Sequence, residues 1–91
     1  MNVLLAILET VANEYTVKAF GALGAGIAVL GGAGSGIGEG FTTAKGVEAI
    51  GRNPDASGKV TSTMIIGCAL VETTGIYALL IALLLLFLVA L

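Results

Sequence analysis

Two long stretches without charged residues dominate the pattern of the chain. The first runs from Ala19 to Gly38. As an α-helix, with a rise of about 1.5 Å per residue, it would span about 30 Å, the thickness of the hydrocarbon core of a bilayer. The second runs from Val60 to Leu91 and is interrupted only by Glu72, so it is longer than one crossing needs. The pattern predicts two transmembrane helices.

The polar segment between these stretches has the chemistry of a turn. Residues 45–59 contain the only proline of the chain, Pro54, and five of its charges. Asn53 precedes that proline and is therefore disfavoured in a helical conformation. We expect an all-α membrane protein built as a transmembrane hairpin, with a first membrane helix over 19–50, a loop over 51–58 and a second membrane helix over 59–91.

The apolar part of the N-terminal segment, 1–18, is too short to cross a bilayer. It ends at Leu8, and polar residues such as Glu9 and Asn13 follow. A secretory signal would carry basic residues before the apolar part, and this segment has none there. We expect an extension that lies at the membrane interface or starts the first helix, with a processed leader as the alternative.

Lysine and arginine are distributed unevenly about the two predicted helices. The loop side carries Lys45, Arg52 and Lys59, whereas the N-terminal side carries Lys18. Because basic residues accumulate on the cytoplasmic side of membrane proteins, we expect a cytoplasmic loop and both termini on the outer side.

The composition excludes several kinds of site. Hydrophobic residues make up 57% of the chain and charged residues 11%, and the chain contains no histidine. A Ser-His pair, a zinc cluster and a disulfide framework are therefore excluded, and we interpret the single cysteine, Cys68, as a packing residue. The four basic residues form no patch and the formal net charge is −2, which argues against nucleic acid as a partner.

Glycines crowd the first predicted membrane helix, where close helix packing is a reason for them. Gly32, Gly36 and Gly40 form one stripe. Because two residues turn a helix by about 200°, Gly34 and Gly38 fall on nearly the opposite side. Two nearly opposite faces of glycine favour a homo-oligomeric ring, in which each glycine-rich helix packs between two copies of itself. The glycine-rich helix would lie inside this ring and the second helix outside, against lipid. A hairpin whose glycines pack only on its own partner helix is the alternative.

Two acidic residues interrupt the membrane segments at matching depths. An acidic side chain inside a bilayer costs about 2.5 to 3.5 kcal/mol, so Glu39 and Glu72 need a functional reason. Both are equally far from the predicted turn, which places them at one level, about 20 Å from the tip of the hairpin. Two carboxylates in a low dielectric cannot both stay ionised, so the pair keeps a proton or binds a cation.

Hydroxyl groups follow the second acidic residue. Thr73 and Thr74 come next, and Tyr77 lies about one and a half turns further along. Hard cations prefer several oxygen ligands, so this set favours Na+ and leaves H+ as the alternative. Each hydroxyl also has a simpler interpretation, because threonine often bonds its own helix backbone and a lone tyrosine is often an interface anchor.

Four motifs, in order, resemble those of the ring-forming proteolipid, or c-ring protein, of the F-type rotary ATP synthase. The resemblance covers about 24–87 and is greatest to the subgroup with two carboxylates. It implies a non-catalytic rotor subunit in a bacterial plasma membrane, with an organelle membrane as the alternative. The motifs are the glycine-rich run over 32–40, Val47-Glu-Ala-Ile50, the loop Arg52-Asn53-Pro54 and Val71-Glu-Thr-Thr-Gly-Ile-Tyr77.

The resemblance also implies the ion site, which sodium-binding members build from two adjacent subunits. Glu72 would carry the coupling ion, and Glu39 would be a second ligand. The other implied positions are the backbone carbonyl of Leu70, the hydroxyl of Thr73, a water-holding hydroxyl at Thr74 and a hydrogen bond to the carboxylate from Tyr77.

The implied partners are identical subunits, membrane lipid and other subunits of the motor. An arginine of the stator's a subunit would pair with Glu72 once its ion has left. The loop at Arg52, Asn53 and Pro54 would dock the gamma and epsilon subunits of the central stalk. Asn53 stands where glutamine is usual but keeps the amide. Thr73 stands where serine is frequent and leaves the choice between Na+ and H+ open.

Two other classes of function are alternatives. A passive pore-forming oligomer would have its acidic residues in water and would conduct ions when purified. A purely structural packing subunit would tolerate Glu72→Gln without loss of ion pumping.

Overall fold

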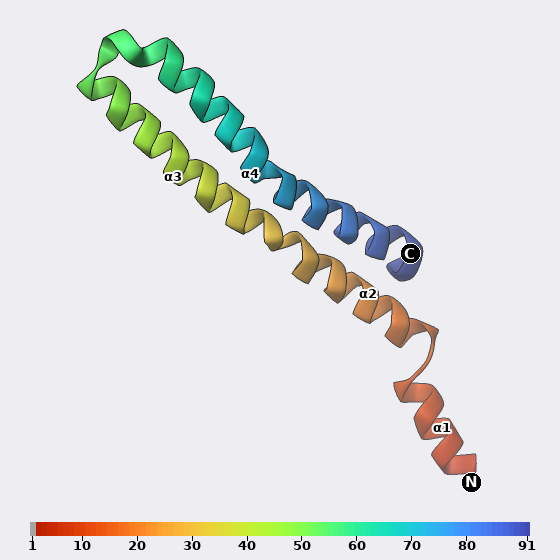
Figure 1. Ribbon diagram of the computed structural model, residues 1–91. Helices are drawn as coiled ribbons and strands as arrows, with labels where there is room; N and C mark the ends of the chain where they lie inside the picture. Colours follow the sequence, from red (N-terminus) through yellow and green to blue (C-terminus); the bar gives the residue numbers. More distant parts are fainter. Residues whose placement is uncertain (1) are drawn as a thin grey trace.

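The computed structural model of the protein describes residues 2–91 and is a long helical hairpin (Figure 1). Helices α2 (Glu14–Val29) and α3 (Gly31–Arg52) form one arm, and α4 (Ser57–Leu85) forms the other. Helix α1 (Asn2–Val11) extends beyond the end of the second arm (Figure 1). Both arms are long and apolar enough to cross a membrane, and their apolar 18-residue stretches have a mean hydropathy of 1.5 and 2.5. The predicted all-α hairpin is confirmed.

The first arm contains one turn at Leu30 that is wound more tightly than an α-helix. The Leu30 N–H donates to the Ile27 carbonyl at 3.2 Å, and the Leu30 carbonyl accepts from the Ala33 N–H at 3.0 Å. These bonds span three residues instead of the four of an α-helix. The sequence predicted one membrane helix over 19–50, whereas the structure begins this arm at Glu14 and divides it at Leu30.

The turn between the arms is short. Asn53 leaves the helical region at φ −142° and ψ 83° because it precedes proline. The 3₁₀ helix η1 (Pro54–Ala56) follows, closed by a hydrogen bond from the Ala56 N–H to the Asn53 carbonyl at 3.0 Å. Helix α4 then begins at Ser57. The chain therefore reverses within the range 51–58 in which the sequence placed the loop.

Glycines let α3 and α4 approach closely. A Cβ at Gly31 would lie 2.8 Å from the Cβ of Ala78, and a Cβ at Gly46 would lie 2.5 Å from the Sδ of Met64. Real Cβ atoms essentially never show contacts under 3.0 Å. A larger residue at Gly31 would therefore push the arms apart, whereas one at Gly46 would displace the flexible side chain of Met64. This packing holds the register of α3 against α4.

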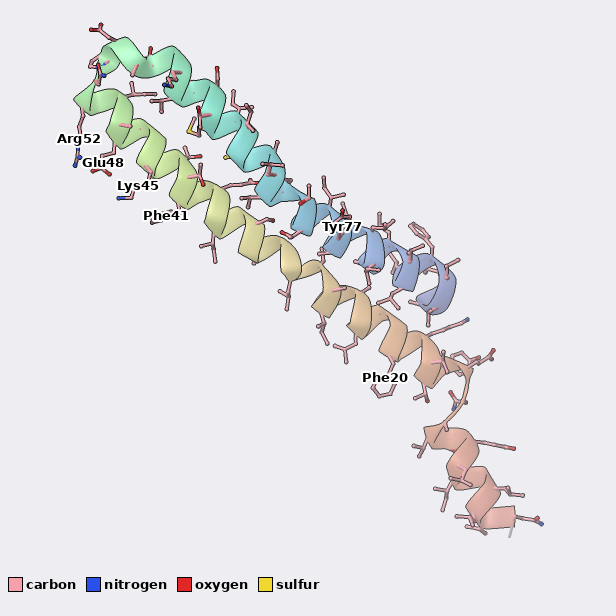
Figure 2. The ribbon with its side chains drawn as sticks, viewed as in Figure 1. Phe20, Phe41, Lys45, Glu48, Arg52 and Tyr77 are labelled. Carbon is pink, nitrogen blue, oxygen red and sulfur yellow. The ribbon has the colours of Figure 1, made fainter. Side chains whose placement is uncertain are left out.

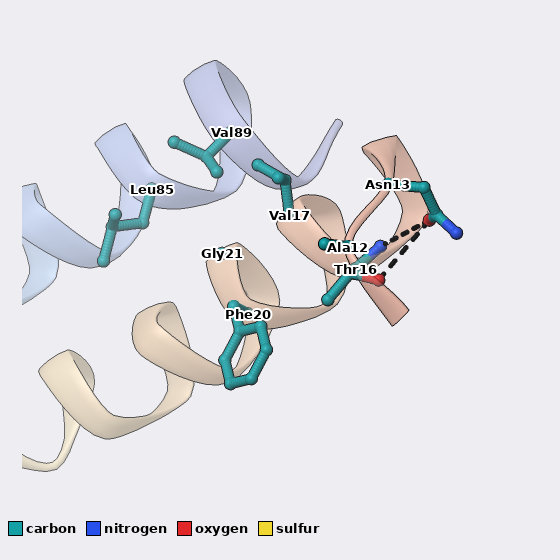
Figure 3. Close-up of a pocket in the computed structure, with 8 residues that line it drawn as sticks. All are labelled: Ala12, Asn13, Thr16, Val17, Phe20, Gly21, Leu85 and Val89. Atoms are coloured by element: carbon teal, nitrogen blue, oxygen red, sulfur yellow. Dashed lines mark hydrogen bonds between the residues drawn. The ribbon is translucent and has the colours of Figure 1, made fainter. Parts of the chain in front are cut away.

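The open end of the hairpin is closed by the π-helix η2 (Leu86–Ala90). A Cβ at Gly21 would lie 2.7 Å from Val89, so η2 rests directly on the backbone of α2. Beside this contact is an apolar groove of about 550 Å³ (Figure 3). It is lined by Ala12, Asn13, Thr16, Val17, Phe20, Gly21, Leu85 and Val89.

Asn13 separates α1 from the first arm. Its side-chain oxygen accepts from the backbone N–H groups of Tyr15 at 2.9 Å and Thr16 at 3.1 Å, which caps α2. Its amide nitrogen donates to the Thr10 carbonyl at 3.1 Å and so also ends α1. The segment over 1–18 is thus a separate helix followed by the start of α2, with Met1 outside the described residues.

The hairpin has almost no hydrophobic core of its own. No large side chain among residues 2–91 is fully buried, and the leucine and isoleucine side chains of α4 are largely exposed. Such a surface is unstable in water but suits lipid and neighbouring protein.

Candidate ion-binding site

Glu39 on α3 and Glu72 on α4 lie side by side across the hairpin. Both are half-buried, and their carboxyl groups are within hydrogen-bonding reach of each other. The constant rise of a helix brings them to one level because the turn lies midway between them. A paired carboxyl site can share a proton or gather a cation.

The hydroxyls of α4 bond to their own helix. Thr73 Oγ1 donates to the Leu70 carbonyl at 2.7 Å, and Thr74 Oγ1 donates to the Val71 carbonyl at 3.0 Å. Leu70 and Tyr77 are 68% and 66% exposed. The Thr73 hydroxyl and the Leu70 carbonyl oxygen therefore lie next to each other on α4, and Thr73 is an exposed residue.

The predicted ligands occupy two different flanks of α4. A helix turns by about 100° per residue, so Tyr77 lies about 140° around the axis from Glu72, and Leu70 lies about 160° around the axis from it. One hairpin therefore presents its two carboxylates on one flank and the Leu70 oxygen on the other. These oxygens can surround one ion only where the flank of one hairpin meets the opposite flank of the next. An oxygen-only set of this kind fits a hard cation.

Ser35 is a polar residue beside the carboxylates that sequence reasoning did not identify as part of the site. It faces α4 from a buried position on α3 and lies next to Gly75 and Glu72. Its spacing of four residues from Gly31, which also faces α4, was a signal that could have placed it there.

The glycines of α3 divide into two groups. A Cβ on Gly32, Gly34, Gly36 or Gly40 would meet nothing within 4 Å in the hairpin. Gly38 differs, because its Cβ would lie 3.2 Å from Val71 of α4. The sequence placed Gly38 with Gly34 on a face toward a neighbouring subunit, and within one hairpin the structure brings it close to α4. Of the five glycines that the sequence assigned to helix packing, four are therefore open for close contact with another chain.

Charged side chains line α3 near the turn, on the side away from α4 (Figure 2). Glu48 pairs with Arg52 at 2.6 Å and with Lys45 at 3.5 Å. All three are exposed, as are Asn53 and Pro54. The predicted partner-binding residues of the loop therefore form an accessible polar tip.

Comparison with known proteins gives one consistent result. The family model for the ATP synthase C subunit matches residues 23–85. The ATP synthase c subunit of Natranaerobius thermophilus is 59% identical over 75 residues, which cover 82% of this chain and 87% of that protein. The c subunit of Alkaliphilus oremlandii is 49% identical over 80 residues (88% and 91%), and that of Clostridium botulinum strain Hall is 55% identical over 71 residues (78% and 90%).

Proposed function

The chain belongs to the family of ATP synthase c subunits, and on that premise we propose that it carries Na+ as the coupling ion on Glu72, with Glu39 as a second ligand. As a member of this family it is a non-catalytic, ion-translocating rotor subunit of the membrane sector. It works in a ring of identical subunits together with other ATP synthase subunits.

The contact between Glu39 and Glu72 carries the proposal. Two carboxylates with one Na+ would leave a net charge of minus one inside lipid, so one of the two keeps a proton while Na+ is bound. The neighbouring copy supplies the remaining oxygens through its Leu70 carbonyl, its Thr73 hydroxyl and a water held by its Thr74. The Tyr77 hydroxyl donates a hydrogen bond to the Glu72 carboxylate. H+ on the same carboxylate is the second candidate.

The ring uses the open glycine face of α3. Gly32, Gly34, Gly36 and Gly40 lie against the neighbouring inner helices, because small residues allow close contact between helices in lipid. Helix α4 lies outside, where its exposed leucine and isoleucine side chains meet lipid.

Neutralisation of Glu72 lets the ring turn through lipid. A charged site would resist leaving the stator, whereas an ion-loaded site passes freely. An arginine of the stator's a subunit pairs with the emptied carboxylate and releases the next ion. Moving one charge through 100 mV is worth about 2.3 kcal/mol, so the ion gradient biases rotation.

The membrane is a bacterial plasma membrane, with the loop cytoplasmic and both termini outside. Lys45, Arg52 and Lys59 near the turn support this orientation. The exposed tip at Arg52, Asn53 and Pro54 docks the gamma and epsilon subunits of the central stalk. Helix α1 then lies at the outer interface.

Carbodiimide labelling of purified rings tests the site. A hydrophobic carbodiimide attacks the protonated carboxyl of Glu72, and Na+ should slow this labelling. If Na+ gives no protection at any pH where labelling proceeds, the coupling ion is H+ and the sodium proposal is wrong. Rings in a planar bilayer should conduct no ions without the stator, and measurable conductance would favour a passive pore instead.

A further inference from the structure

Ser35 is the buried polar side chain among the described residues. It lies on α3 and is 3% exposed. Its hydroxyl donates to the Gly32 carbonyl at 3.0 Å. A hydroxyl has one proton to donate and two lone pairs to offer, so the Ser35 oxygen still has acceptor capacity toward a further partner.

The carboxyl of Glu72 approaches the same space, which Gly75 leaves open. A Cβ at Gly75 would lie 2.6 Å from Ser35 Oγ and 2.9 Å from Glu72 Oε1. The hydroxyl of one arm and the carboxyl of the other therefore converge on a point that any larger residue at position 75 would occupy. The carboxyl is turned inward, toward α3, because this space is free.

We propose that Ser35 is a positioning residue of the ion site, whose Oγ offers a lone pair to the proton or Na+ carried by Glu72 and so holds that carboxyl against α3. The inference rests on the proposed function, because it assumes that Glu72 carries the ion. The inference adds Ser35, a residue of α3, to the site formed by Glu39 and Glu72. Gly75 contributes by leaving room for the carboxyl.

The role follows from the cost of an unpaired polar group in the hairpin. An ion-loaded carboxyl that turns inward meets a polar oxygen at Ser35, whereas an alanine would present a methyl group. A hydrogen bond of this kind contributes a factor of about three to ten to an equilibrium. Loss of the hydroxyl should therefore let Glu72 leave its inward position more often.

The experiment compares Ser35→Ala with a matched variant, Thr42→Val. Thr42 is half-buried on the same helix and its hydroxyl also bonds to its own helix, to the Gly38 carbonyl at 3.0 Å, but it lies about two turns from Ser35. In purified rings at a pH acidic enough to keep Glu72 protonated, Ser35→Ala should label faster with carbodiimide. At higher pH it should need about three to ten times more Na+ for half-protection. Thr42→Val should behave as wild type.

The outcomes separate this inference from the proposed function. If Na+ protects wild type but half-protection is unchanged in Ser35→Ala, the role of Ser35 is wrong and the sodium site stands. If Na+ protects no ring, sodium coupling is wrong, and the labelling rate alone decides: a faster rate in Ser35→Ala supports the inference and an equal rate overturns it.

A second variant tests the space at Gly75. Gly75→Ala places a methyl group between Ser35 and Glu72, so it should accelerate labelling at least as much as Ser35→Ala. Ring mass by native mass spectrometry controls for assembly, because a purely structural role would change the ring without changing protection in the rings that form. Wild-type labelling in Gly75→Ala rings would overturn the inference.

Discussion

Glu39 and Glu72 come from opposite arms of the hairpin, and their carboxyl groups lie within hydrogen-bonding reach of each other. Both are half-buried at one level of the two arms. Because both residues lie in segments that cross the membrane, a charge on one carboxyl group makes ionisation of the other less favourable. Replacing them one at a time separates their roles.

Glu39→Gln should weaken Na+ binding without abolishing it. Glutamine keeps one side-chain oxygen but cannot share a titratable proton with Glu72 as the second carboxyl does, so half-protection against carbodiimide should need about tenfold more Na+, a change of about 1.4 kcal/mol. Glu48→Gln is the control, because Glu48 is exposed on the same helix and pairs with Arg52. Unchanged protection in Glu39→Gln would remove Glu39 from the site.

Glu72→Gln should abolish ATP-driven ion pumping in the assembled ATP synthase. The amide cannot release a proton or balance the charge of Na+, so the site can no longer be loaded and emptied. Pumping in inverted vesicles measures the effect, and native mass spectrometry shows whether the ring still forms. Normal pumping by this variant would favour a structural packing subunit.

Thr73→Val should impair Na+ protection more than Thr74→Val. Thr73 Oγ1 lies 2.7 Å from the Leu70 carbonyl, so its loss removes one of two neighbouring oxygens. We expect half-protection to need about three to ten times more Na+. Thr74→Val removes a hydroxyl that acts only through water and should have a smaller effect. Equal effects of the two variants would contradict this assignment.

Gly36→Leu should prevent or alter ring assembly while leaving the hairpin helical. A Cβ at Gly36 meets nothing within 4 Å inside the hairpin, so the leucine would project toward a neighbouring chain. Gly58→Ala is the control, because position 58 is also open but lies in the first turn of α4. Native mass spectrometry of detergent-purified protein distinguishes the two. Normal rings from Gly36→Leu would exclude Gly36 from the interface.

Helix α1 should lie along the outer surface of the plasma membrane, with one helix face in lipid. Leu8 belongs to its apolar face and Glu9 to its polar face, about 100° apart. In a Cys68→Ala background, a spin label on Leu8→Cys should be more accessible to oxygen, and one on Glu9→Cys more accessible to a water-soluble nickel complex. Equal access of both labels to the nickel complex would mean that α1 projects into water.

The pattern of the sequence was enough to predict the two arms, the turn and the matching depth of the two acidic residues. Inside lipid a single segment can satisfy its backbone hydrogen bonds only as a helix, so length and hydropathy determine the arms. Asn53 ends the first arm because it precedes Pro54. The depth of Glu39 and Glu72 then follows from the constant rise of a helix.

Only the tertiary structure decided which side chains meet across the hairpin. Gly38 belongs by spacing to a face with Gly34, yet it packs on Val71. Ser35 is one more small residue in a glycine-rich run until the fold places it beside Gly75 and Glu72. Spacing determines how residues are arranged around one helix, but the rotation of that helix about its own axis depends on how side chains of both arms fit together, which no local pattern contains.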